Sequence, residues 1–170
     1  IKRAIEAERL SMAVTNPRDF SHNKHGQVDD TPYGGGAGML MMAPPIFEAV
    51  ESVIAQYDSE TNSAYSTDEI CDEMSLIGNP SESIRRRVIF MGPTGQPFTQ
   101  EKARELATYD QLVLICGHYE GVDYRVEEHL VDETISIGDY VLTGGELPAM
   151  VVADAVARMI PGVLGAASGA

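Results

Sequence analysis

One pattern occurs three times in the second half of the chain: a short apolar run, then a glycine-containing loop, then a segment with helical character. The apolar runs are Val88–Met91, Leu112–Cys116 and Thr134–Ile137. Apolar strands that alternate with helices form a parallel sheet with both faces covered, and ligands bind beyond the carboxyl ends of such strands. The chain is therefore expected to be an α/β protein whose parallel sheet is flanked by helices and carries binding loops at one edge.

The segments after these strands carry turn and helix signals. Gly92–Pro97 is rich in turn residues, and Thr99 is a good N-cap for the helix expected after it. Asp123–Leu130 is expected to form a short helix, and Leu147–Ile160 a helix with one largely apolar face.

The first half of the chain is less regular. Ile1–Leu10 has helical character, and Met12–Thr15 is compatible with a short strand. Apolar residues at helical spacing predict an amphipathic helix over Pro44–Ile54, since proline is tolerated in the first turn. Tyr57–Ser83 is rich in Ser, Asp, Glu, Asn and Thr, so a mobile polar insertion with at most short structure is expected there.

Composition excludes several classes of protein. A chain of 170 residues fits one domain, and no run approaches the ~20 apolar residues that a membrane span needs. The net charge of −14 argues against a broad basic surface for nucleic acid, so any contact with RNA is expected to be local. Cys71 lies in a polar acidic stretch, whereas Cys116 ends an apolar run. The two cysteines therefore do not suggest a disulfide framework, and a reducing cytoplasm is the simplest location for the protein.

Three glycine-containing segments are candidates for ligand binding: Asp29–Gly38, Cys116–Asp123 and Ser136–Pro148. The first has no Gly-Lys-Ser/Thr after it and lacks the dinucleotide-binding spacing, so neither a P-loop nor a classical dehydrogenase is supported. Main-chain groups in the other two could recognise adenine or ribose, and Glu120 or Asp139 could face a sugar or a cation. The alternative is that the glycines form structural turns and the carboxylates cap helices.

Together these segments resemble the motifs of the bacterial tRNA (guanine-N1)-methyltransferase family TrmD. Val28–Met39, Cys116–Gly121 and Ser136–Pro148 carry the resemblance, which extends from about Asn16 through Gly165. It implies a SPOUT-type fold, in which a parallel sheet flanked by helices carries a deep C-terminal trefoil knot, an exception to the usual absence of threaded chains. It also implies a homodimer whose active sites lie at the subunit interface.

The resemblance further implies a domain organisation. Residues 1–165 are expected to be the SPOUT methyltransferase catalytic domain without its first strand, and 57–83 the polar insertion within it. Residues 166–170 are expected to begin the interdomain linker, and the C-terminal tRNA-binding domain of the family is expected to lie outside this chain.

The function that the resemblance implies is methyl transfer in the cytoplasm from S-adenosylmethionine to N1 of the guanosine at tRNA position 37, just 3′ of the anticodon. Main-chain atoms of Ile137–Leu142 are expected to recognise adenine. The family's glycine loop, which helps to receive the guanosine, corresponds here to Tyr33, Gly34, Gly35, Gly36 and Gly38. The residues expected to bind the donor are Pro93, Gly117, Tyr119, Glu120, Gly121, Ile137, Gly138, Asp139, Tyr140, Val141, Leu142, Gly144, Gly145 and Pro148.

The chemistry needs two further groups. Guanine N1 carries a proton at neutral pH, so a general base must remove it, and a cation near O6 would stabilise the charge that develops. Arg158 matches the family arginine proposed for the second task, whereas the family's aspartate base would follow the motif at 161–165, beyond this chain. The resemblance suggests that Mg²⁺ assists turnover, but no residues are assigned as metal ligands.

Some residues depart from the family pattern, and other functions stay open. His118 stands where arginine is more usual, Tyr124 where a polar or acidic residue is common, and Ala37 where proline is common. One alternative is another SPOUT RNA methyltransferase, which would modify ribose or a different base atom. Another is a module that binds the donor or RNA without catalysis.

Overall fold

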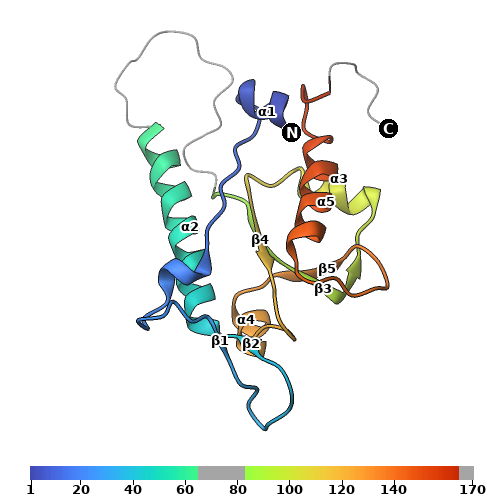
Figure 1. Ribbon diagram of the computed structural model, residues 1–170. Helices are drawn as coiled ribbons and strands as arrows, with labels where there is room; N and C mark the ends of the chain where they lie inside the picture. The colour runs from blue at the N-terminus through green and yellow to red at the C-terminus, as the bar shows by residue number, and fades with distance from the viewer. Residues whose placement is uncertain (65–82, 165–170) are drawn as a thin grey trace.

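A computed structural model describes residues 1–64 and 83–164 and has a three-stranded parallel sheet at its centre (Figure 1). The strands are β3 (Arg86–Pro97), β4 (Gln111–Cys116) and β5 (Glu133–Ser136), in the order β4-β3-β5. In the middle strand Met91 lies opposite Cys116 of β4 and Ile135 of β5. The predicted parallel sheet flanked by helices is therefore confirmed.

Two apolar layers cover the two faces of the sheet. Helices α2 (Ala43–Ala64) and α4 (Tyr124–His129) lie on one face, and α3 (Gln100–Leu106) and α5 (Glu146–Ala157) on the other. Successive residues of β3 alternate between the layers: Val88 and Phe90 pack toward α2, Ile89 and Met91 toward α3 and α5. Because strand side chains alternate between faces, a continuous apolar run is what a strand buried on both sides requires.

The end of β3 differs from the expectation. The sequence predicts that the strand stops at Met91 and that Gly92–Pro97 forms a turn, but β3 continues to Pro97 across an irregularity between Met91 and Gln96. Both Met91 and Gln96 pair with Ile135, so the four residues between them bulge out of the ladder. A Cβ on Gly95 would lie 2.5 Å from the carbonyl carbon of Thr134, which explains the glycine at this close approach.

Helix α2 is longer than expected. The predicted helix ends at Ile54, and the insertion was expected from Tyr57, yet α2 continues to Ala64. Residues 65–82, most of the expected insertion, lie outside the described residues. The additional turns carry polar residues, which local periodicity does not assign to a helix, and contacts with the sheet hold them in place.

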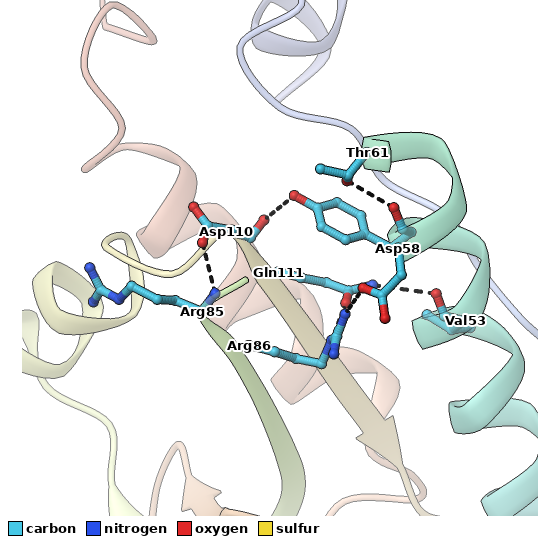
Figure 2. Close-up of polar contacts among 8 residues, drawn as sticks. Val53, Asp58, Thr61, Arg85, Arg86, Asp110 and Gln111 are labelled. Carbon is cyan, nitrogen blue, oxygen red and sulfur yellow. Dashed lines mark hydrogen bonds and ion pairs between the residues drawn. The ribbon is translucent and has the colours of Figure 1, made fainter. Parts of the chain in front are cut away.

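Figure 2 shows these contacts at the start of β3 and β4. Arg86 forms an ion pair with Asp58 of α2 and also donates from Nε to Gln111 Oε1 at 2.5 Å. The hydroxyl of Tyr57 donates to the main-chain oxygen of Asp110 at 3.1 Å. The polar half of α2 is thus stabilised by tertiary hydrogen bonds rather than by an apolar stripe.

The N-terminal segment has little regular structure. It contains α1 (Lys2–Glu6), the 3-10 helix η1 (Pro17–Phe20) and the antiparallel pair β1 (Asp29–Asp30) and β2 (Leu40–Met41), which lies beside α4 (Figure 1). The expected short strand over Met12–Thr15 is wrong: these residues are exposed, and Val14 is 97% accessible. Without a neighbouring strand the segment has no partner for ladder hydrogen bonds.

The N-cap predicted at Thr99 is confirmed, and the short helix expected from Asp123 is capped by that residue. Thr99 Oγ1 accepts from the amide of Lys102 at 3.2 Å, and Asp123 Oδ1 accepts from the amide of Arg125 at 3.0 Å. Within residues 1–64 and 83–164, none of the helices combines the length and apolar character that crossing a membrane requires.

Candidate active site

The carboxyl ends of the three parallel strands bring their following segments to one edge of the sheet. The segment after β5 crosses the end of β3 and reaches the end of β4, where the amide of Gly145 donates to the carbonyl of Gly117 at 2.9 Å. A Cβ on Gly145 would lie 2.7 Å from Cys116 Cα, so only glycine permits this approach. The expected convergence of the segments 116–123 and 136–148 is therefore observed.

The glycine loop before β2 joins the same edge. Main-chain hydrogen bonds connect Glu120 N to Met39 O at 3.1 Å, Met41 N to Gly121 O at 2.9 Å, and Asp123 N to Met41 O at 2.9 Å. A Cβ on Gly38 would lie 2.2 Å from Glu120 Cγ. Three segments far apart in sequence thus form one continuous surface, which we call the donor edge: 33–41, 116–123 and 136–148.

A cavity of about 250 Å³ opens beside the bulge of β3. Ser136 is buried, and its hydroxyl donates to Gly138 O at 3.0 Å, which turns the chain sharply after β5. Four of the residues expected to bind the donor are in the cavity wall: Pro93, Ile137, Gly138 and Asp139. The remaining lining residues are Gly95, Pro97, Phe98 and Ser136.

The other expected donor residues lie outside that cavity wall. Tyr119, Tyr140, Val141 and Leu142 are exposed by 47%, 54%, 82% and 38%, respectively. Glu120 is also exposed, Gly121 and Gly144 are half-buried, and Pro148 lies in the first turn of α5. The exposed side chains lie on the donor edge and are available to a ligand or to another chain.

Tyr119 has an unusual backbone conformation. Its φ of +60° lies in the left-handed region, where a bulky residue is strained. Arg18 donates from Nη2 to the Tyr119 hydroxyl at 3.2 Å and from Nη1 to Gly26 O at 3.0 Å. Sequence reasoning missed Arg18, because its contact with Tyr119 spans 101 residues and has no local signal.

His118 and Glu146 form a second contact that the sequence does not reveal. Their side chains pair through His118 Nε2 and Glu146 Oε1, and so join the loop after β4 to the first residue of α5. Both side chains are about half exposed, at 44% and 54%. The pair lies next to Gly144, where a Cβ would come within 2.8 Å of the imidazole.

Cys116 is the last residue of β4, and its free thiol is partly buried. Burial raises its pKa from 9.0 to about 11, and the nearby charge of Glu146 adds to the effect. A neutral thiol is a poor nucleophile at physiological pH. No nucleophilic role is therefore assigned to Cys116.

Arg158 is not near the donor edge of its own chain. Gly145 is the N-cap and Arg158 the C-cap of the 12-residue helix α5, and at 1.5 Å rise per residue their Cα atoms are about 20 Å apart. Arg158 instead borders an open groove of about 470 Å³ along α5, with Leu147, Met150 and Val151 in its wall. These three apolar residues are exposed by 57%, 57% and 49%.

Among the described residues, no group of three or more His, Cys, Asp and Glu side chains could hold a metal ion. No ligands for the Mg²⁺ suggested by the resemblance are identified there.

Comparison with known proteins identifies the family. A family model described as tRNA (Guanine-1)-methyltransferase TrmD matches residues 1–170. The chain is 54% identical over 165 residues to the tRNA (guanine-N(1)-)-methyltransferase of Desulforamulus reducens, covering 97% of this chain and 56% of the relative. Identity is 52% over 167 residues to the enzyme of the same name from Pelotomaculum thermopropionicum, covering 98% of this chain and 57% of the relative.

A more distant relative gives the same result. The Bacillus cereus protein of that name is 46% identical over 165 residues, covering 97% of this chain and 57% of the relative. This chain spans somewhat more than half the length of these relatives. With a family model matched over the whole chain and relatives near 50% identity, the chain belongs to the tRNA (guanine-1)-methyltransferase TrmD family.

Proposed function

We propose that the protein to which this chain belongs transfers a methyl group from S-adenosylmethionine to N1 of the guanosine at position 37 of tRNA. The relatives are named for guanine-N1 methylation of tRNA. The observation that carries the proposal is the donor edge, where three segments of family-like sequence meet, one of which, 136–148, also lines a cavity beside β3. Cytoplasmic location follows from a tRNA substrate.

The chemistry of the donor edge fits S-adenosylmethionine. Ile137 and Gly138 line the cavity, and main-chain atoms of this loop would recognise the adenine, while Glu120 and Asp139 would supply carboxylates for hydroxyls or for cationic groups of the donor. When bound, the donor supplies an electrophilic methyl carbon. The chain's own part is to hold that carbon in line with guanine N1 and to exclude water.

The acceptor would enter across the glycine loop. Tyr33 is 88% exposed, and a Cβ on Gly34, Gly35 or Gly36 would meet no atom within 4 Å, so this backbone is open to a nucleoside. Arg158 would place a positive charge near guanine O6 as N1 loses its proton. The base that accepts this proton is proposed to come from the segment after residue 165, and no step is assigned to Mg²⁺.

We further propose that the active unit is a homodimer built on the exposed apolar face of α5. Leu147, Met150 and Val151 form an apolar patch of the kind that usually marks an interface. A dimer would also bring Arg158 of one subunit toward the donor edge of the other. The dimer would therefore explain how Arg158 can act at a donor edge although the two lie about 20 Å apart within one chain.

The deep trefoil knot of SPOUT proteins is part of the proposal. Its support is the crossing after β5: this strand lies on the far side of β3 from β4, yet the following segment returns to Gly117 at the end of β4. The chain must pass over the end of β3 to do so. A crystal structure of the full-length dimer with donor would test both the knot and the position of the ligand.

The activity is tested with the full-length protein, S-adenosylmethionine carrying a labelled methyl group, and a tRNA transcript with guanosine at position 37. Nuclease digestion and mass spectrometry should find 1-methylguanosine at that position, and a transcript with adenosine there should remain unmodified. A methyl group on ribose or on another base atom would instead favour a different SPOUT RNA methyltransferase. Donor binding without transfer would favour a binding module.

The role of Arg158 is tested by Arg158→Ala. Loss of one preorganised charge should lower kcat by about 100-fold or more, whereas donor binding measured by calorimetry should stay close to wild type because Arg158 is assigned to the guanine and not to the donor. Normal turnover in this variant would contradict the assignment.

A further inference from the structure

An exposed tyrosine and an arginine stack beside the donor edge. The guanidinium carbon of Arg125 lies 5.9 Å from the ring centroid of Tyr33, within the range of a cation–π contact. Tyr33 nevertheless remains 88% exposed, and the Arg125 side chain 54% exposed. Their contact joins the glycine loop to the first turn of α4, and it leaves most of the aromatic surface open to solvent.

Arg125 is fixed in orientation. Its Nε and Nη2 donate to the two carboxylate oxygens of Asp123 at 2.9 and 2.5 Å, and the Asp123 side chain is only 14% exposed. Such a bidentate pair holds the guanidinium plane rigidly. Asp123 is itself tied to the donor edge, because its amide donates to Met41 O at 2.9 Å. The plane next to Tyr33 is therefore preorganised rather than mobile.

The ion pair of Arg125 with Asp123 also limits which ligands Tyr33 and Arg125 can recognise. The charge of Arg125 is already balanced by Asp123, and the whole chain carries a net charge of −14. A phosphate would find little free positive charge here. An unpaired base does not need that charge, since it binds by stacking on aromatic rings and on guanidinium planes.

We propose that Tyr33 and Arg125 form a stacking platform for an unpaired base that adjoins the target guanosine in the anticodon loop. The inference rests on the proposed function, because it takes tRNA as the substrate. Tyr33 immediately precedes the open glycines of the acceptor loop, so a base next to the guanosine lies within reach of its ring.

The test is a thermodynamic cycle between protein and RNA. Full-length wild type and Tyr33→Ala are titrated with a tRNA transcript by fluorescence anisotropy, with S-adenosylhomocysteine present to prevent turnover. The same titrations use transcripts with an abasic nucleotide on the 5′ or the 3′ side of the guanosine. Tyr33→Ala should weaken binding of the intact transcript about tenfold, and Tyr33→Phe should bind it like wild type.

The abasic transcripts identify the cause of that loss. If Tyr33 stacks on a neighbouring base, wild type and Tyr33→Ala should bind equally well to the transcript that lacks it. If Tyr33→Ala weakens binding to all three transcripts by the same factor, the platform is overturned and Tyr33 merely shapes the loop. Failure of the proposed function would look different, because wild type would then leave guanine N1 unmethylated whatever the binding data show.

Arg85 supplies a matched control for Arg125. Arg85 also stacks on a tyrosine, with its guanidinium carbon 5.3 Å from the ring of Tyr109, but it lies at the opposite end of the sheet. Arg125→Lys keeps the charge and loses the plane, so it should weaken tRNA binding several-fold, whereas Arg85→Lys should leave it unchanged. The role of Arg125 would be contradicted if both substitutions weakened tRNA binding equally, or if Arg125→Lys did not weaken it.

Discussion

At the scale of single residues, Gly145 has no room for a side chain. It follows the loop after β5, and a Cβ there would lie 2.7 Å from Cys116 Cα and 2.9 Å from the amide nitrogen of Gly117. Both neighbours are main-chain atoms of the end of β4, which cannot move without disturbing the sheet. A larger residue at position 145 would therefore change the shape of the donor edge.

Gly145→Ala should lower the free energy of unfolding by about 1–3 kcal/mol, the usual cost of overpacking. It should also weaken binding of S-adenosylmethionine, because the two loops are forced apart. Thermal unfolding and calorimetry measure the two effects. Gly26→Ala is the control: φ is +61° there, but nothing lies within 4 Å of the added Cβ, so donor affinity should be unchanged. Wild-type donor affinity in Gly145→Ala would be inconsistent with this packing.

The thiol of Cys116 gives a prediction about pH. Because burial raises its pKa to about 11, only about one molecule in a thousand carries the thiolate at pH 8. In a Cys71→Ser background, alkylation by iodoacetamide should therefore be slow at pH 8 and should accelerate until the pH passes about 11. Rapid alkylation near neutral pH would show that the thiol is not buried as described.

The same shift affects stability. The pKa in the folded protein is higher than that of an exposed thiol, so the protonated form is favoured by folding. The contribution of Cys116 is complete below pH 9 and is lost as the pH rises through about 11.

At the scale of elements, the contact between the side chains of His118 and Glu146 connects the loop after β4 with the start of α5. His118 and Glu146 are both about half exposed, so their pair should add less than about 1 kcal/mol to global stability. Its effect on ligand binding is expected to be larger, because it fixes two segments of the donor edge relative to each other.

Glu146→Gln should therefore raise the dissociation constant of S-adenosylmethionine several-fold while leaving the melting temperature nearly unchanged. His118→Ala should have the same effect, and the double variant should be no worse than either single one, since both remove one contact. His22 and Glu48 are a second exposed pair, 2.6 Å apart, between the N-terminal segment and α2. Glu48→Gln should leave donor affinity at the wild-type value, and additive effects of His118→Ala and Glu146→Gln would argue against a shared contact.

At the scale of the whole molecule, the exposed apolar face of α5 and the position of Arg158 both favour a dimer. Met150→Lys places a charge in the middle of this face, where Met150 is 57% exposed. Sedimentation should detect monomers and the transfer assay should detect little activity. Glu101→Lys on α3 adds a positive charge outside the face and should leave the dimer intact. An active monomer of Met150→Lys would rule out the proposed arrangement.

Mixed dimers test whether Arg158 acts across the interface. Coexpression of Arg158→Ala with Gly145→Ala should produce a dimer in which one site combines an intact donor edge with the intact Arg158 of the partner. Such a mixture should recover part of the activity that each variant lacks alone. No recovery would mean that both groups must come from the same chain.

Part of the candidate site could be predicted from residues alone. The glycines and strand ends of 116–123 and 136–148 identified segments that do meet, because parallel strands end at the same edge of a sheet. Arg18 and Glu146 could not be predicted, since their partners Tyr119 and His118 are 101 and 28 residues away. Contacts of this kind depend on the path of the chain and leave no local signal.

The amino-acid sequence by itself determined the local structure: the parallel strands, whose apolar runs suit burial on both faces, and the helix starts at Thr99 and Asp123. Only the tertiary structure decided that α2 continues to Ala64 and that β3 resumes pairing at Gln96. The physical reason is how far apart in sequence the interacting residues are. Periodicity and capping act between residues a few positions apart, whereas the ion pair of Asp58 with Arg86 and the ladder of β3 with β5 exist only after distant segments have packed together.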